Sequence, residues 1–309
     1  MSKLKLILDR EPIFINPYTD FGFKKLFGEE ANKDLLIDFL NQLMPNHHQV
    51  KDLYFQNTDN QSDTKYQRKA FFDIQCVAAV TEEQFIVEMQ KAKVVHFEDR
   101  SIYYSTFPIK GQAKKGKDWD FELKPTYFIA ILDFEYDQHY QKREVIRKVG
   151  LIDQNGELFS DNVHYIFIQM PLFNKKEEEL VTKLDKWLYF LKNLENFDSI
   201  PEILNEPIFK KGFETAKIAN MNAREYENYE RNRMIYWENE SAMKNALVLG
   251  EKKGMEKGME KGMDSKAYAM VKNCLLRGYS DEVTAELAEV THEFVTKVKT
   301  QLEKEGLLA

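Results

Sequence analysis

Hydrophobic residues follow two different periods along the chain, and together these predict strands mixed with helices. Near the N-terminus, large apolar side chains recur at helical spacing from Phe23 to Leu43, with Thr19 or Asp20 as the helix cap and Pro45 as its end. Further on, apolar runs of strand length are separated by polar turns. Strands are expected at residues 53–55, 71–76, 85–91, 126–134, 145–151 and 164–170, with a helix over residues 97–106. This order predicts an α/β domain with a mixed central sheet flanked by helices.

The chain changes character after Pro171, where charge becomes dense and the apolar residues keep helical spacing. Ser280 and Thr291 are natural caps for two short helices near the end of the chain. Helices are predicted over residues 177–194, 202–240, 267–277, 280–288 and 293–302. The last three form either a small helix-turn-helix bundle or a packing module that does not contact DNA. The pattern therefore predicts a charged helical C-terminal extension.

An internal repeat of Glu-Lys-Gly-Met places Gly254, Gly258 and Gly262 four residues apart. Glycine inside a helix costs about 1 kcal/mol relative to alanine, so an isolated helix here would be only marginally stable. A four-residue period nevertheless keeps the glycines close to one helix face, where a second helix backbone can approach. The repeat is therefore either a flexible charged tether or a self-pairing helix.

The length of 309 residues and the hydrophobic content of 43% allow a sizeable core and about two domains. We expect a core over residues 1–175, a helical region over 176–250, the repeat over 251–265 and a small helical module over 266–309. Two cysteines, Cys76 and Cys274, fit reduced and buried thiols better than a disulfide or a zinc site. The chain has no apolar run of about 18 residues, and its N-terminus reaches charged residues too soon for a secretory signal. We therefore expect a cytoplasmic protein without membrane contact.

Two neighbouring strands each carry an acid among apolar residues, Asp73 in the first and Glu88 in the second. Residues 81–84 form the turn of a hairpin between them. Because strand side chains alternate, Asp73, Glu88 and Gln90 are expected on one side of this hairpin. Apolar neighbours are expected on the other side, namely Phe72, Ile74, Val87 and Met89. A half-buried acid costs free energy unless it is neutralised, so the pair predicts a divalent cation site and a metal-dependent hydrolase.

An ordinary structural explanation exists for Asp73, for Glu88 and also for Asp20, the acid at the start of the first predicted helix. Asp20 is then only a helix cap, and Asp73 pairs with Arg68 or Lys69. Glu88 and Gln90 then form the solvent side of an amphipathic strand.

A basic segment follows the helix predicted over residues 97–106, and glycines at positions 111 and 116 lie within it. Its lysines are Lys110, Lys114, Lys115 and Lys117. The segment is either a mobile loop that follows the phosphate backbone of DNA or an ordinary solvated loop. The net charge of −7 argues weakly against a protein that binds nucleic acid through its whole surface.

Several segments, in their order along the chain, resemble the PD-(D/E)XK nuclease superfamily. Asp20 lies near the start of a helix, Asp73 follows in Phe-Phe-Asp-Ile, and Glu88 and Gln90 follow in Glu-Met-Gln. More narrowly, the chain is similar to the Rpn-type recombination-promoting nucleases and transposases of bacteria. The segments that carry this resemblance are residues 16–20, 85–90, 99–105 and 119–125. The resemblance covers residues 14–240 and extends to the glycine-repeat tail.

This resemblance implies a restriction-endonuclease-like α/β fold and Mg²⁺-dependent endonucleolytic cleavage of DNA, with Mn²⁺ as a possible substitute. Asp73 and Glu88 would be the metal ligands, and Asp20 would be the helix-borne acid that orients water or an outer ligand. Gln90 stands where the superfamily usually has lysine, and glutamine neither carries charge nor takes up a proton.

The role of that lysine is then absent, supplied by the metal alone, or taken over by Lys91, Lys93 or Arg100. Arg100 is also a candidate phosphate clamp, although an arginine on a helix is commonly a surface ion-pair partner.

Two functional classes follow from these residues. The first is a DNA endonuclease acting in recombination or transposition, for which a homodimer is expected because double-strand cleavage usually needs two active sites. The second is a catalytically impaired, nuclease-derived DNA-binding or interaction protein, which the missing lysine favours. The residues do not distinguish DNA from RNA as the substrate.

Overall fold

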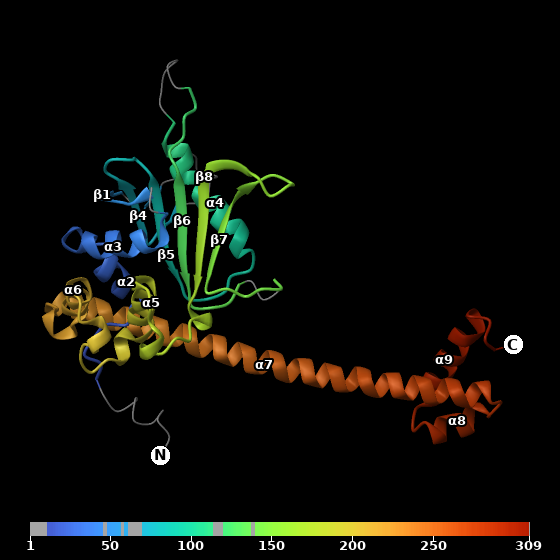
Figure 1. Ribbon diagram of the computed structural model, residues 1–309. Coiled ribbons are helices and arrows are strands. Elements are labelled where there is room, and N and C mark those ends of the chain that lie inside the picture. Colours follow the sequence, from blue (N-terminus) through green and yellow to red (C-terminus); the bar gives the residue numbers. More distant parts are fainter. Residues whose placement is uncertain are drawn as a thin grey trace. The chain divides into compact units, whose positions relative to one another are not determined.

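The short apolar runs form one six-stranded mixed sheet with the strand order β1-β4-β5-β6-β8-β7 (Figure 1). The computed structural model describes residues 11–45, 48–56, 59–60, 70–113, 120–136 and 140–308. The strands of the sheet are β1 Leu53–Phe55, β4 Ile74–Ala78, β5 Gln84–Gln90, β6 Thr126–Leu132, β7 Ile146–Ile152 and β8 Leu158–Gln169. Strands β5, β6 and β8 are parallel to one another, whereas the β1–β4, β4–β5 and β7–β8 pairs are antiparallel. The mixed central sheet predicted from the sequence is therefore confirmed, whereas the strand predicted over residues 71–76 is interrupted before β4 begins at Ile74. A separate two-stranded sheet pairs β2 Asp59–Asn60 with β3 Ala70–Phe71.

Helices cover both faces of this sheet, and this explains why all seven residues of β6 are buried. One face packs in a large core with α2 Asp20–Phe27, α3 Lys33–Leu43, α5 Lys183–Asn193 and α6 Pro207–Ala216 (Figure 1). The other face packs in a smaller core with α4 Phe97–Gly111. Within β6, Ile129 and Ile131 belong to the large core, and Phe128 and Ala130 belong to the smaller one. Each strand of the parallel centre thus contributes side chains to both cores.

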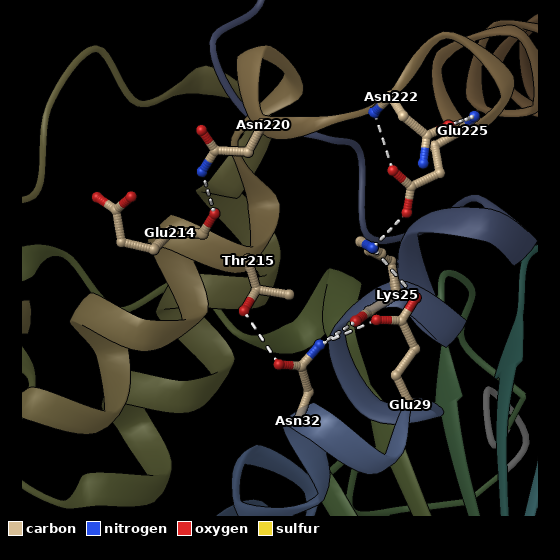
Figure 2. Close-up of polar contacts among 8 residues, drawn as sticks. All are labelled: Lys25, Glu29, Asn32, Glu214, Thr215, Asn220, Asn222 and Glu225. Atoms are coloured by element: carbon tan, nitrogen blue, oxygen red, sulfur yellow. Dashed lines mark hydrogen bonds and ion pairs between the residues drawn. The ribbon is translucent and has the colours of Figure 1, made fainter.

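The N-terminal helical segment is divided in two, although its apolar spacing runs on from Phe23 to Leu43. Helix α2 ends at Phe27, a 3-10 turn spans Glu30–Asn32, and α3 begins at Lys33. Asn32 stabilises the break, because its side chain donates to the carbonyl of Lys25 at 3.0 Å and accepts from Thr215 at 3.3 Å (Figure 2). The partner residue lies in α6, so the break depends on a tertiary contact.

The glycine repeat lies inside one long helix, α7 Ala223–Leu276, and not in a loop. After it come α8 Asp281–Leu287 and α9 His292–Lys304, which Ser280 and Thr291 cap as predicted. The end of α7 packs with these two helices in a small separate core. It consists of Val271, Leu275, Ala285, Val295, Val298 and Leu302.

By its internal contacts the chain divides into two compact units, Met1–Tyr236 and Trp237–Ala309. The finer domain boundaries expected from the sequence remain predictions. Cys76 and Cys274 are free and buried, in agreement with the expected reduced thiols. Among the residues described, no helix combines the length and the apolar character needed to cross a membrane.

Candidate active site

The β4–β5 hairpin places Glu88 in a buried position. Antiparallel pairing sets Ile74 opposite Val87, and along β5 the residues Val87 and Met89 pack in the large core while Ile86 packs in the smaller one. Glu88 follows the same alternation and shares the side of Ile86. The charge of Arg100, a residue of α4, acts on its carboxyl group, and the exposed fraction of Glu88 is only 2%. The alternative that Glu88 belongs to the solvent side of an amphipathic strand is therefore wrong.

Asp73 lies in a bend between β3 and β4, not inside a strand as the sequence predicted. Phe72 packs in the smaller core and Ile74 in the large core, so these two residues do not share one side of the hairpin as expected. The physical reason is a side-chain hydrogen bond, in which the backbone N–H of Met89 donates to Asp73 Oδ2 at 2.8 Å. Met89 lies beyond the last paired residues of the β4–β5 ladder. The carboxylate thus ends the ladder and lies beside the part of β5 that carries Glu88.

The charge of Asp73 acts on Glu88. The pKa of Glu88 is raised to about 8, mainly by burial and also by the charge of Asp73, while Arg100 and a hydrogen bond from Gln90 oppose the rise. Burial also raises the pKa of Asp73, against the hydrogen bond from Met89. Two desolvated acids close together disfavour double ionisation unless positive charge is added.

One oxygen of Glu88 is satisfied and the other is not. Gln90 Nε2 donates to Glu88 Oε2 at 2.6 Å, whereas Glu88 Oε1 is buried and finds no hydrogen-bond partner among the described residues. A buried polar atom without a partner costs about 1–3 kcal/mol, and a cation would satisfy it. The donor set fits Mg²⁺, which takes one or two carboxylates together with water and phosphate oxygens. Within the described ranges, no group of three or more His, Cys, Asp or Glu residues is arranged to hold a metal.

Helix α2 contributes a third acid beside this pair. Its cap is Thr19, whose hydroxyl accepts from the N–H of Gly22 at 2.9 Å, so the side chain of Asp20 is not used as the cap. Asp20 forms an ion pair with Lys24 at 2.9 Å, and its negative charge raises the pKa of Asp73. Asp20, Lys24 and Asp73 line one cleft of about 460 Å³. Lys24 was not predicted as a site residue, although its position four residues after Asp20 on a helix is a recognisable signal.

Three cations, Arg100, Lys93 and Lys91, were predicted near the acids, and the first two differ in their surroundings. The guanidinium of Arg100 lies 4.7 Å from the ring centre of Tyr104, and its positive charge lowers the pKa of Glu88. The Nε atom of Arg100 is buried without a hydrogen-bond partner in the described part of the chain. Lys93 Nζ instead donates to the backbone carbonyls of Glu135 and Tyr136, each at 3.4 Å.

Lys91 is half-buried and follows β5 directly. Its Nζ lies 5.6 Å from the ring centre of Tyr236. Burial lowers the pKa of Lys91, and the charges of Asp20 and Asp73 oppose this change. Lys91 is therefore close to both acids. The sequence gives no signal for Tyr236, because it belongs to a distant helix.

The first turns of α7, which lead to Tyr236, are fixed to α2 by a polar network (Figure 2). Lys25 of α2 contacts Glu29 at 3.2 Å and Glu225 of α7 at 2.6 Å. Glu225 and Asn222 form reciprocal hydrogen bonds between side chain and backbone, both at 3.0 Å, as in a capping box. Because α7 is anchored in this way, the aromatic ring beside Lys91 has a defined position.

Only one lysine of the predicted basic segment can be placed. Lys110 is exposed near the end of α4. Lys114, Lys115 and Lys117 lie outside the described residues, as do Arg68 and Lys69, the structural partners considered for Asp73.

The mixed six-stranded sheet with helices on both faces has the architecture of a restriction-endonuclease-like α/β protein, as expected from the sequence. The family model described as PD-(D/E)XK nuclease family transposase matches residues 17–246. This match covers more than half of the chain, so the protein belongs to that family and its function is related to nucleases and transposases. Comparison with curated proteins and with solved structures gave no significant match.

Proposed function

We propose that the protein is a metal-dependent endonuclease that hydrolyses phosphodiester bonds of DNA in recombination or transposition. The observation that carries this proposal is the buried pair of Asp73 and Glu88, in which Glu88 Oε1 has no hydrogen-bond partner among the described residues. Family membership supports the same reaction class.

In this proposal Asp73 and Glu88 hold a divalent cation, Mg²⁺ or in its place Mn²⁺. The bound metal supplies a water that is nucleophilic near neutral pH and stabilises negative charge on the scissile phosphate. Gln90 orients Glu88 through its hydrogen bond of 2.6 Å but transfers no proton, because an amide has no titrating group. Asp20, which lines the cleft beside Asp73, orients water or an outer ligand.

Arg100 is proposed to clamp a phosphate, since a guanidinium is suited to paired hydrogen bonds with phosphate oxygens. Lys110, Lys114, Lys115 and Lys117 are proposed to contact the DNA backbone, which would make binding weaker at high salt. A homodimer is proposed for cleavage of both strands.

A second candidate function is a nuclease-derived protein that binds DNA without cleaving it. The observation in its favour is that Gln90 replaces the usual lysine and that its amide donates to Glu88. A site with two acids and no suitable cation would bind metal yet leave the phosphate poorly stabilised.

Purified protein incubated with supercoiled plasmid and Mg²⁺ or Mn²⁺ tests the proposal. We expect nicking by the natural chain and none by Asp73→Asn or Glu88→Gln. Glu178→Gln is the matched control, because Glu178 is an exposed acid outside the cleft. Nicking that persists in both site variants would exclude the proposed site. DNA binding without any nicking by the natural chain would favour the second candidate, and a labelled RNA substrate tested in parallel decides between the two sugars.

A further inference from the structure

The position that usually carries the lysine of this superfamily holds Gln90, and its amide already donates to Glu88. Phosphate hydrolysis increases negative charge around the scissile phosphate, and a fixed cation at that point lowers the barrier. The site therefore needs a positive charge from another side chain in order to catalyse this reaction. Four basic side chains lie near enough to be compared.

Two of these four are held by oxygen atoms, and Arg100 acts on a different acid. Lys24 forms an ion pair with Asp20 at 2.9 Å. Lys93 Nζ lies at 3.4 Å from two backbone carbonyl oxygens. Arg100 stacks on a ring of its own helix, α4, and its charge acts on Glu88 from the side of the smaller core.

Lys91 differs from these in its position and in its neighbours. It follows the last residue of β5, so the sheet fixes its backbone. Its side chain is half-buried beside the ring of Tyr236, and the charged groups that act on it are Asp20 and Asp73. An ammonium over an aromatic ring is stabilised by about 0.5–2 kcal/mol, the larger value applying where water is excluded. Lys91 is thus directed to the acids of the cleft by packing and by charge.

We propose that Lys91 provides the positive charge that Gln90 lacks, with its ammonium in contact with the scissile phosphate beside Asp73 and with Tyr236 holding it in place. This inference rests on the proposed nuclease function. It assigns the role of the usual lysine to the next residue along the chain, which approaches Asp73 and Asp20 from the other side of β5.

The test compares three variants. Two are the single substitutions Lys91→Gln and Lys91→Arg, and the third, called the exchanged pair, combines Gln90→Lys and Lys91→Gln in one chain. In plasmid or oligonucleotide cleavage, Lys91→Gln is expected to lower kcat by roughly 10²–10³, the range for loss of one stabilising donor, with a smaller change in KM. Lys91→Arg should keep part of the rate because the charge remains. The exchanged pair should recover much of the loss, since it restores an ammonium next to Glu88.

A second measurement does not depend on cleavage or on metal. In EDTA, the slope of log affinity for DNA against log salt should decrease in magnitude by about 0.9 in Lys91→Gln, as expected for one lost phosphate contact. Lys210→Gln, an exposed lysine on α6, is the matched control and should leave both rate and slope unchanged. Melting curves show whether each variant is folded.

The outcomes separate this inference from the proposed function. The role of Lys91 would be overturned if Lys91→Gln left both the cleavage rate and the salt slope unchanged. If Asp73→Asn were inactive in the same experiment, the proposed nuclease function would still stand. An equal loss in Lys93→Gln, or no recovery in the exchanged pair, would also count against the role of Lys91. If the natural chain cleaves nothing, the nuclease function fails, and the salt slope in EDTA still decides whether Lys91 contacts phosphate.

Discussion

At the scale of single residues, the decisive feature is that β5 buries an acid with incomplete hydrogen bonding. This burial lowers the free energy of unfolding, since an unpaired buried carboxylate is stable mainly in its neutral form. Gln90 reduces the cost by donating to Glu88 Oε2 at 2.6 Å, and Oε1 remains for a ligand. In the proposed function, this oxygen is the atom that a cation would contact.

This arrangement predicts a particular pH dependence for the metal-free protein. The pKa of Glu88 rises from 4.5 to about 8, so between these values the folded state binds more protons than the unfolded state. Stability from Glu88 is then fully present below pH 4.5 and is lost as pH rises through about 8. The raised pKa of Asp73 acts in the same direction. In EDTA, we expect Tm to fall between pH 5 and pH 9 by roughly 5 °C or more.

Scanning calorimetry across this pH range provides the measurement, with Glu88→Gln as the comparison. The variant has no titrating group at this position, so its Tm should be nearly level where that of the natural chain falls. At pH 8, Mg²⁺ should raise the Tm of the natural chain and have little effect on the variant, because a ligand stabilises only the state that binds it. If the Tm of both proteins changed with pH in the same way, the predicted titration of the buried Glu88 would be contradicted.

Tyr236 gives a second prediction at this scale, because its ring lies 5.6 Å from Lys91 Nζ. Tyr236→Phe keeps the ring and should keep most of the cleavage rate. Tyr236→Leu removes the ring and should lower kcat by roughly threefold to tenfold, as expected for loss of about 1 kcal/mol of cation–π stabilisation. Steady-state kinetics at one pH compares the two variants, and equal rates would show that the ring does not position Lys91.

At the scale of elements, much of the fold could be predicted from alternating and helical spacing, and the exceptions have identifiable causes. The hairpin, the alternation of side chains along β5 and the mixed sheet follow from patterns within single strands. The bend at Asp73 does not, because it depends on a hydrogen bond from Met89 of the neighbouring strand. The division between α2 and α3 likewise depends on Asn32 and a residue of α6. Proximity of Lys91 to Tyr236 was not predictable either, since no local pattern brings α7 to the end of β5.

The segment that opens α2 shows how a short motif positions the site. Asn16 Oδ1 accepts from the N–H of Tyr18, and the hydroxyl of Thr19 donates to the carbonyl of Asn16, both at 2.8 Å. Gly22 packs so closely that an added Cβ would lie 2.1 Å from the carbonyl oxygen of Asn16. This compact turn fixes the start of α2, and with it the position of Asp20.

We therefore predict that Thr19→Ala lowers both stability and cleavage. Loss of an N-cap usually costs about 1 kcal/mol of folding free energy, and here it also frees the turn that positions Asp20. Ser280→Ala removes the equivalent cap of α8, so it should cost a similar amount while leaving cleavage unchanged. Urea unfolding and plasmid nicking measure the two effects. An equal effect of both substitutions on nicking would show that the cap of α2 has no special relation to the site.

At the scale of the whole molecule, the candidate site belongs entirely to the unit Met1–Tyr236, whereas the glycine repeat belongs to Trp237–Ala309. The family match ends at residue 246, before the repeat. The sequence left open whether the repeat is a tether or a helix, because its glycines disfavour a helix while its period suits one. The structure places the repeat within α7. Self-pairing of that helix remains a prediction.

The repeat allows a last prediction from helix propensity. At Gly254, Gly258 and Gly262, an added Cβ would meet no atom within 4 Å in the described part of the chain. Alanine at each position should then stabilise α7 by about 1 kcal/mol, with no steric penalty within one chain. The triple alanine variant should show slower amide hydrogen exchange in this part of α7, and unchanged nicking by the other unit. Faster exchange, or a smaller molecular mass in light scattering than the natural chain shows, would mean that the glycines serve close contact between two copies.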